Sequence, residues 1–378
     1  ILQFTVPHCE IRKESKHCLK INLDNNKRST MPAFSRFKKQ LTVCASVLAI
    51  GVGGLLASSS VSAADKFVWK VQSHWPGSSS SYTDSLERIK RIIEEGSDGR
   101  MELKLYEAGA LFKAKQTFDA VSRGILEMGT ISPAYAQDKM TLAGIASGLP
   151  FAFRNVWEAA YFHQGLGFEK MLREEAAQYG VYWATDKVYP TEMVVKKPIN
   201  SWDDFSSLKI RSSGALQKFL TEAGAAASYV PGSELYPALD SGVVDGAHWG
   251  AAQGAYSMGL YEVAKYHVKP ALNIAGTDVI IVSQKALDKL PKDLQDLVKQ
   301  TLEEEFWFRT NEYQYKERLT LAKAIKEDGV KVNTMPKDVQ DRLVKTAQKM
   351  WAEEGERSDR AKKALDMLKG YLTDLGYL

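Results

Sequence analysis

Arg211 is the residue whose place in this sequence points most directly to chemistry. It closes the predicted strand 208–210 and precedes Ser212-Ser213-Gly214, a loop that opens a predicted helix from Ala215. A guanidinium in that place can form two parallel hydrogen bonds with a carboxylate, helped by the helix N-terminus behind it. An ion pair at the surface or between two parts of the protein explains the spacing equally well.

Two histidine-tryptophan pairs also stand at the ends of predicted strands. His74-Trp75 ends an early strand, and His248-Trp249 ends a later one. A tryptophan packs in a core more often than it lines a pocket, and a single histidine is more often a satisfied buried group than a ligand-binding one. Both pairs are therefore candidate pocket residues, with core packing as the alternative.

Patterns of catalysis are missing from residues 65–378. No G-x-S-x-G, Walker or G-x-G-x-x-G motif follows a predicted strand there, and the run Glu303–Glu305 falls on a predicted helix, where a solvated face is expected. Metal-ligand spacing is absent among the histidines of this part, which are His74, His163, His248 and His267. Neither a disulfide nor a thiolate nucleophile is available to it, because the cysteines of the chain are Cys9, Cys18 and Cys44.

Strands and helices that would position these residues alternate along the chain. The first unit has predicted strands at 67–72, 101–106 and 130–132, and helices at 82–95 and 118–123. A second unit begins near Val181, with predicted strands at 181–185, 193–196, 208–211, 229–230 and 243–249 and helices at 215–223 and 234–239. This alternation favours an α/β fold with a largely parallel sheet, whose crevice lies at the carboxyl ends of the strands.

The last hundred residues connect the two units. Residues 278–283 form a very apolar strand that returns to the first unit, and a helix begins at Pro291 and continues to about Glu327. At 1.5 Å per residue this helix would span roughly 50 Å. Two final helices are expected at about 336–354 and 359–375. We therefore expect two lobes with a ligand cleft between them and one long helix across both.

Residues 31–64 have the order of a secretory signal. Met31 is followed by a basic stretch, an apolar run over 41–56, a serine-rich region and Val61-Ser62-Ala63-Ala64. We expect cleavage after Ala63 or Ala64; an uncleaved anchor and a lipid-modified Cys44 are the alternatives. Residues 1–30 show no strong periodicity and are interpreted as an upstream extension without a function of their own.

The charge of the exported part argues against nucleic-acid binding. Residues 1–64 contain nine Lys or Arg and three Asp or Glu, so residues 65–378 carry about −2 of the chain's formal charge of +4. A mildly acidic protein lacks the positive surface that a polyanion requires.

Several motifs in the second unit resemble one known family. Leu208–Arg211, Val230–Leu239 and Ser241–Gly246 are similar to the signature stretch of the extracytoplasmic receptors of tripartite ATP-independent periplasmic (TRAP) transporters. Similar motifs occur in the expected order at 109–111, 121–124, 149–151 and 287–297. Each motif alone is weak, but the ordered set is specific, and the resemblance covers about residues 66–378.

The resemblance implies a two-lobed periplasmic-binding-protein fold that closes around hinges near residues 189–191 and 275–278. Lobe I would comprise 65–188 plus about 277–308, and lobe II 189–276 plus about 309–378. The resemblance also implies a periplasmic location, a small and a large membrane subunit as partners, and no ATPase. Arg211 matches the family's arginine that pairs with the ligand carboxylate.

Within the family, Gly246–Trp249 and Leu260–His267 look most like the branch that binds 2-oxo and 2-hydroxy monocarboxylates together with a metal ion. The metal-binding carboxylate of that branch is expected just before Trp249, where this chain has His248, and Pro270–Gly276 contains no acidic residue. A hard cation needs several oxygen ligands, so we expect neither a metal nor another cofactor. His248 would instead contact the ligand, and, if it is protonated, affinity would fall as the pH rises.

The leading interpretation is a transport receptor for a small organic anion, a monocarboxylate of the 2-oxo, 2-hydroxy or aromatic type. A secreted enzyme or a chemosensory receptor on the same bilobed fold are the alternatives, and the sequence leaves monomer and dimer open. The candidate ligand-binding residues are Arg211, His248, Trp249, Trp75, Tyr135, Ser213, Thr191 and Phe151.

Overall fold

A computed structural model of the protein describes residues 66–378. The predicted extension, 1–30, and the predicted signal, 31–64, lie outside the described residues. The strands are β1 (Phe67–Gln72), β2 (Met101–Tyr106), β3 (Met128–Ile131), β4 (Val181–Val195), β5 (Lys209–Arg211), β6 (Ala226–Ser228), β7 (Gly246–Gly250), β8 (Tyr266–Ser283) and β9 (Lys331–Thr334).

The α-helices are α1 (Glu87–Gly96), α2 (Thr117–Ser122), α3 (Ala143–Ala146), α4 (Val156–Ala160), α5 (Phe168–Ala177), α6 (Trp202–Ser206), α7 (Gly214–Glu222), α8 (Gly232–Asp240), α9 (Ala252–Ser257), α10 (Leu260–Val263), α11 (Gln284–Leu287), α12 (Lys292–Glu327), α13 (Lys337–Gly355) and α14 (Asp359–Asp374). Short π or 3-10 turns are η1 (Tyr82–Leu86), η2 (Ala114–Gln116), η3 (Pro133–Tyr135) and η4 (Tyr161–Gly165).

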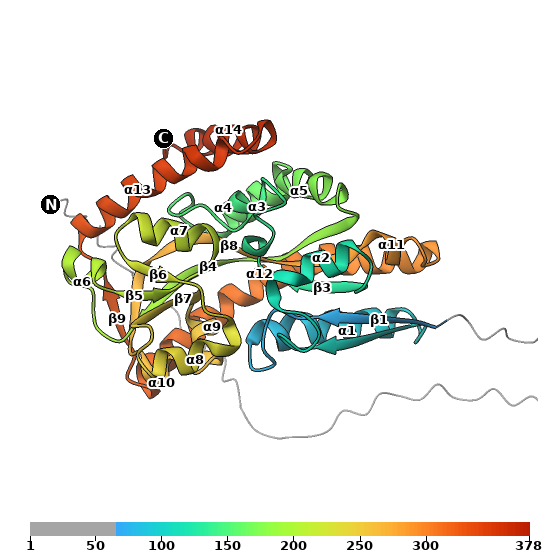
Figure 1. The fold of residues 1–378 in the computed structure, drawn as a ribbon, viewed down its shortest axis with the longest axis horizontal. Helices are drawn as coiled ribbons and strands as arrows, with labels where there is room; N and C mark the ends of the chain where they lie inside the picture. Colours follow the sequence, from blue (N-terminus) through green and yellow to red (C-terminus); the bar gives the residue numbers. More distant parts are fainter. Residues whose placement is uncertain (1–65) are drawn as a thin grey trace, which may run out of the picture. The chain divides into compact units, whose positions relative to one another are not determined.

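The strands of the described residues form one mixed sheet. Its order is β2-β1-β3-β8-β4-β7-β5-β6, and β9 pairs with β8 (Figure 1). The outer strands pair in parallel, β1 with β2 and β3 at one end and β5 with β6 and β7 at the other. The two long central strands, β4 and β8, are antiparallel to each other. The expectation of an α/β fold is therefore confirmed, but the sheet is less parallel than the sequence pattern predicted.

The long strands β4 and β8 join the two ends of the sheet. The sequence predicted β4 as two separate strands and placed the start of β8 twelve residues too late, at Asp278. Asp186 and Lys187 interrupt the apolar pattern of β4, yet both are buried because they pair with each other. Register shifts divide the pairing of β4 with β8 between Thr185 and Lys187, and again on either side of Thr191.

Most other predicted elements are present within two or three residues of their expected ends. Ser201 begins α6 by accepting a hydrogen bond from the Asp204 backbone N–H. The predicted strand at 229–230 is wrong, because the strand beside β5 lies at 226–228. The long helix α12 is continuous from Lys292 to Glu327, in agreement with the predicted helix.

Helix α12 contacts elements from both ends of the sheet. Its Glu305 pairs with Arg88 of α1, its Thr310 accepts a hydrogen bond from the Val188 backbone N–H of β4, and its Glu317 accepts hydrogen bonds from the N-terminus of α9. The C-terminal helices α13 and α14 pack together, and in Figure 1 they run along the top of the molecule in red. Every helix of residues 66–378 is too short or too polar to cross a membrane.

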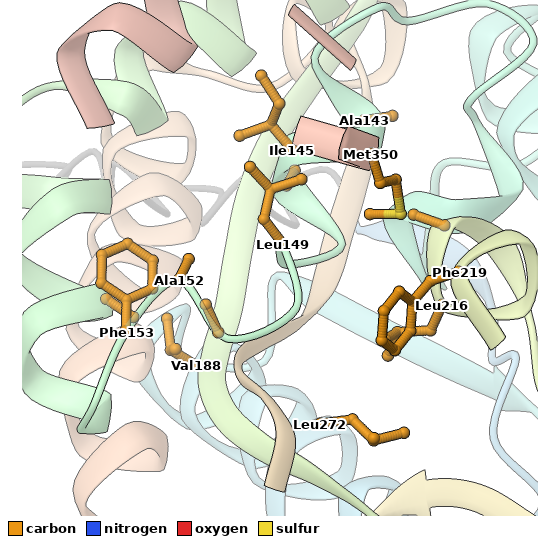
Figure 2. Close-up of a cluster of buried hydrophobic side chains, with 14 of the residues drawn as sticks. Ala143, Ile145, Leu149, Ala152, Phe153, Val188, Leu216, Phe219, Leu272 and Met350 are labelled. Carbon is orange, nitrogen blue, oxygen red and sulfur yellow. The ribbon is translucent and has the colours of Figure 1, made fainter. Parts of the chain in front are cut away.

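Buried apolar side chains form a continuous cluster that includes both ends of the sheet. Ile131 of β3 and Ile210 of β5 belong to it. Figure 2 shows one part, where side chains of α3, α7 and α13 meet beside the central strands; Ile145, Phe219 and Met350 are among them. Two smaller clusters lie around β1 with α1 and around α8 with α9. The sheet that carries Arg211 is thereby fixed on a packed interior.

Candidate ligand-binding site

Arg211, the last residue of β5, is buried, with 3% of its surface exposed. Its Nε donates a hydrogen bond to the Val230 carbonyl at 2.9 Å, and its Nη1 donates one to the His248 carbonyl at 2.9 Å. These two bonds orient the guanidinium and leave further N–H groups to donate. Burial lowers the pKa of Arg211, but a guanidinium stays protonated at neutral pH.

No Asp or Glu forms an ion pair with Arg211 in the part of the chain that the structure describes. The groups that act on its charge are instead the phenols of Tyr135, Tyr229 and Tyr189. A buried charge without a partner is costly, so this arrangement favours an anion that comes from outside the chain.

Trp249 of β7 packs against the guanidinium. The centroid of its ring lies 4.7 Å from Arg211 Cζ, a distance at which a cation is attracted to the face of the ring. The ring also lies against Gly232 at the start of α8, where a Cβ would be 2.6 Å from Trp249 Cη2. The absence of a side chain at Gly232 therefore allows the tryptophan to approach.

A cavity of about 80 Å³ lies beside these residues. Of the predicted site residues, the structure brings together the following along its wall: Arg211, His248, Trp249, Trp75, Tyr135, Ser213 and Thr191. Phe151 is not among the lining residues; its ring packs against that of Phe219 at 6.2 Å between centroids. Ser213 is the N-cap residue of α7 and makes no side-chain capping bond, so its hydroxyl is available at the wall.

His248 is a neutral group in this site. Its Nδ1 lies 3.0 Å from the Ser212 hydroxyl, and its carbonyl holds Arg211. Burial, with the nearby charge of Arg211, lowers the pKa of His248 to about 3. The possibility raised by the sequence, that a protonated His248 helps to hold an anion, is therefore wrong near neutral pH.

An acidic residue that the sequence analysis missed also lines the cavity. Asp278 Oδ2 lies 2.7 Å from Lys187 Nζ, and Asp278 Oδ1 lies 3.4 Å from His74 Nε2. Burial opposes the ionisation of Asp278, but the charge of Lys187 and the contact with His74 hold the pKa of Asp278 well below its usual range. The available signal was an acidic residue at the start of an otherwise apolar strand.

Lys187 lies behind the wall, with none of its surface exposed. Its Nζ also contacts Asp186 Oδ2 at 2.9 Å and lies 4.8 Å from the ring centroid of Trp75 and 4.9 Å from that of Tyr189. The rest of the wall is rich in hydroxyl groups, which belong to Ser79, Ser80, Ser81, Ser132, Ser147, Thr277, Tyr189 and Tyr313. Burial raises the pKa of Tyr189 and of Tyr313 well above the ordinary value, so both are neutral donors.

Comparison with known proteins places this arrangement in a family. The model of the bacterial extracellular solute-binding protein family 7 matches residues 72–358. The chain belongs to this family. Its members are solute receptors of TRAP transporters and not enzymes, and they are periplasmic. The two-lobed α/β fold with a ligand cleft is the fold of the family.

Individual relatives agree with this assignment. A monocarboxylate 2-oxoacid-binding periplasmic protein of a Nostoc species is 27% identical over 65% of this chain and 68% of its own length. A TRAP solute-binding protein of Bordetella bronchiseptica, solved with calcium and picolinate, has a TM-score of 0.75 at 26% identity and covers 82% of this chain and 93% of its own. A second TRAP solute-binding protein, that of Pseudoalteromonas atlantica, was solved with sodium and pyruvate. It has a TM-score of 0.74 at 25% identity and covers 82% of this chain and 95% of its own.

The metal ions of these relatives do not fit the cavity of this family member. Asp278 is the one acidic residue among the lining side chains, and its charge is already offset by Lys187. His248 occupies the neighbouring wall, and its nitrogen is a poorer ligand for a hard cation than a carboxylate oxygen.

Glu192, His267 and Glu317 form a separate buried cluster whose ligand atoms lie within 4.8 Å of one another. Each already has a protein partner: Glu192 pairs with Lys269, His267 Nδ1 lies 2.7 Å from the Tyr261 hydroxyl, and Glu317 accepts two backbone N–H bonds. We interpret the cluster as a structural connection between β4, β8 and α12.

Proposed function

We propose that this family member captures a small monocarboxylate in the cavity beside Arg211 and delivers it to the small and large membrane subunits of a TRAP transporter. One observation carries the proposal: a buried guanidinium, oriented by two carbonyls, faces a cavity without a carboxylate partner. A carboxylate would satisfy its remaining N–H groups with charge-assisted hydrogen bonds.

The size of the cavity supports a small ligand. One water needs roughly 10–15 Å³ on the same measure, so a cavity of about 80 Å³ accepts a compact molecule of several non-hydrogen atoms. The relatives that were solved with picolinate and with pyruvate bind acids of this size class. The many hydroxyl groups and the position of Phe151 outside the wall favour a polar acid over a bulky apolar one.

Export would precede this function. We infer that residues 31–64 direct secretion into the periplasm and are removed after Ala63 or Ala64, because their basic, apolar and small-residue zones follow the order of a signal peptide. The mass of the exported protein tests this inference, and retention of residues 31–63 contradicts it.

A thermal-shift screen of residues 65–378 against organic acids tests the proposal. A ligand at one hundred times its dissociation constant stabilises the native state by about 2.7 kcal/mol, which is visible as a higher melting temperature. We expect small monocarboxylates to give such a shift, and the corresponding amides to give none. If no acid stabilises the protein while a neutral solute does, the proposal fails.

A further inference from the structure

The cavity has a second charged pole opposite in sign to Arg211. Arg211 and Asp278 both line this cavity. Arg211 comes from β5 and Asp278 from β8. The proposed function uses only the positive charge of Arg211 and gives Asp278 no role.

Asp278 is held in place from behind. Lys187 Nζ contacts Oδ2 at 2.7 Å and is itself held by Asp186 at 2.9 Å. His74 faces Oδ1, and the Thr130 hydroxyl fixes the His74 ring by contacting Nδ1 at 2.7 Å. Asp186 and Lys187 lie on β4, Thr130 lies on β3 and His74 follows the end of β1, so the sheet holds the groups that orient the carboxylate.

Asp278 retains the capacity to accept a hydrogen bond from a ligand. An ionised carboxylate offers about four lone-pair sites, and Lys187 uses one of them. The distance of 3.4 Å from Oδ1 to His74 Nε2 is too long for a strong hydrogen bond. Because Asp278 lines the cavity, the remaining acceptor sites are within reach of a bound molecule.

A fixed acceptor discriminates between ligands in a way that hydroxyl groups cannot. Serine, threonine and tyrosine hydroxyls can donate or accept, so they serve a carbonyl and a hydroxyl equally. A carboxylate can only accept, and an oxo group placed against it leaves two buried acceptors facing each other. A site built to pair with a donor rejects the analogue that lacks it.

Building on the proposed function, we propose that Asp278 makes this receptor selective for carboxylates that carry a hydrogen-bond donor, a hydroxyl, amino or lactam N–H group, next to the carboxylate. Arg211 binds the carboxylate of the ligand, and Asp278 accepts a hydrogen bond from the donor. The 2-oxo acids and the unsubstituted acids fill the same space but lack the donor.

Isothermal titration with matched acids tests this selectivity. The first series shares a three-carbon skeleton: propionate, pyruvate, L-lactate, D-lactate and L-alanine. The second compares L-pyroglutamate with cyclopentanecarboxylate, five-membered rings with and without an N–H group. In at least one series, we expect the donor-bearing acid to bind about tenfold more tightly, or better, than its donor-free analogues.

Asp278→Asn is the matching variant, because an amide can donate as well as accept. In Asp278→Asn, we expect the ratio of affinities for donor-bearing and donor-free acids to fall toward one. The control is Asp245→Asn, which removes the same charge from a partly exposed residue just before β7 and should keep the ratio of the wild type. Equal or tighter binding of the donor-free acids by the wild-type protein overturns the inference and leaves the proposed function intact. Absence of binding by every acid overturns the proposed function, and if Asp278→Asn does not fold, the wild-type ranking decides alone.

Discussion

At the scale of single residues, we expect Arg211 to supply most of the binding energy of this receptor. Arg211→Ala should weaken the binding of a carboxylate by about thirtyfold or more, because truncation of one partner of a desolvated charge pair costs roughly 2–5 kcal/mol. Arg211→Lys should recover little, since an ammonium group cannot form two parallel bonds. Titration calorimetry measures both, with the exposed Arg91→Ala as a control for the loss of positive charge. Near wild-type affinity in Arg211→Ala would remove the central claim about this site.

His248 should make the folded protein less stable in acid and should not add to the pH dependence of binding. Its pKa is lowered to about 3, so between that value and about pH 6.5 the unfolded chain binds a proton that the folded chain does not. The free energy of unfolding should therefore fall as the pH falls through this window, and His248→Gln should reduce the loss. Affinity for an ionised carboxylate should stay constant from about pH 6 to 8. A steady decline of affinity over that range would show that the imidazole is protonated in the complex.

At the scale of elements, strands and helices with a regular apolar or charged pattern could be predicted. Strands whose polar residues are buried by partners far along the chain could not. The limits of β1 and β2 were predicted to the residue, and α12 was recognised from Pro291 and its charged periodicity. The continuous β4 was missed because Asp186 and Lys187 look like a turn in the sequence. Their burial depends on Asp278, which is 91 residues from Lys187 along the chain. Arg211 was proposed from its place at a strand end, and Asp278 also begins an apolar strand, but the sequence does not show the partner Lys187 that keeps it buried and ionised.

The elements around the cavity also argue that binding needs no metal. β7 supplies His248 where the related branch is expected to have a carboxylate, and β8 supplies one acid that Lys187 already neutralises. Affinity measured by titration calorimetry should be unchanged after exhaustive treatment with EDTA, which removes calcium, and after dialysis into a sodium-free buffer. The melting temperature without ligand is the control, since a metal bound elsewhere would change stability without changing affinity. A loss of affinity that calcium or sodium alone restores would show that oxygen atoms of the chain or of the ligand complete a cation site.

At the scale of the whole receptor, we expect ligand capture to close lobe I, 65–188 plus about 277–308, onto lobe II, 189–276 plus about 309–378. The expected hinges at 189–191 and 275–278 lie on β4 and β8, near the register shifts in their pairing. Across the lobes, Gln253 of α9 donates a hydrogen bond to Asp84 at 3.0 Å, and the Ser80 backbone N–H donates one to the Ser257 hydroxyl at 3.3 Å. Each of these two polar contacts is weak, and a carboxylate between Arg211 and the opposite wall would add to the attraction between the lobes.

Small-angle scattering measures this closure directly. The radius of gyration should decrease when a saturating carboxylate is added. The ligand shifts the population toward the closed state because it binds that state more tightly than the open one. Arg211→Ala, at the same concentration of ligand, should keep the larger radius, which separates closure from a general effect of the added salt. Gln253→Ala should bind the ligand but close less completely, since it loses one contact between the lobes while the ligand site is preserved. An unchanged radius in the wild-type protein at calorimetric saturation would mean that the cavity fills without movement of the lobes, and the hinges would then have no part in capture.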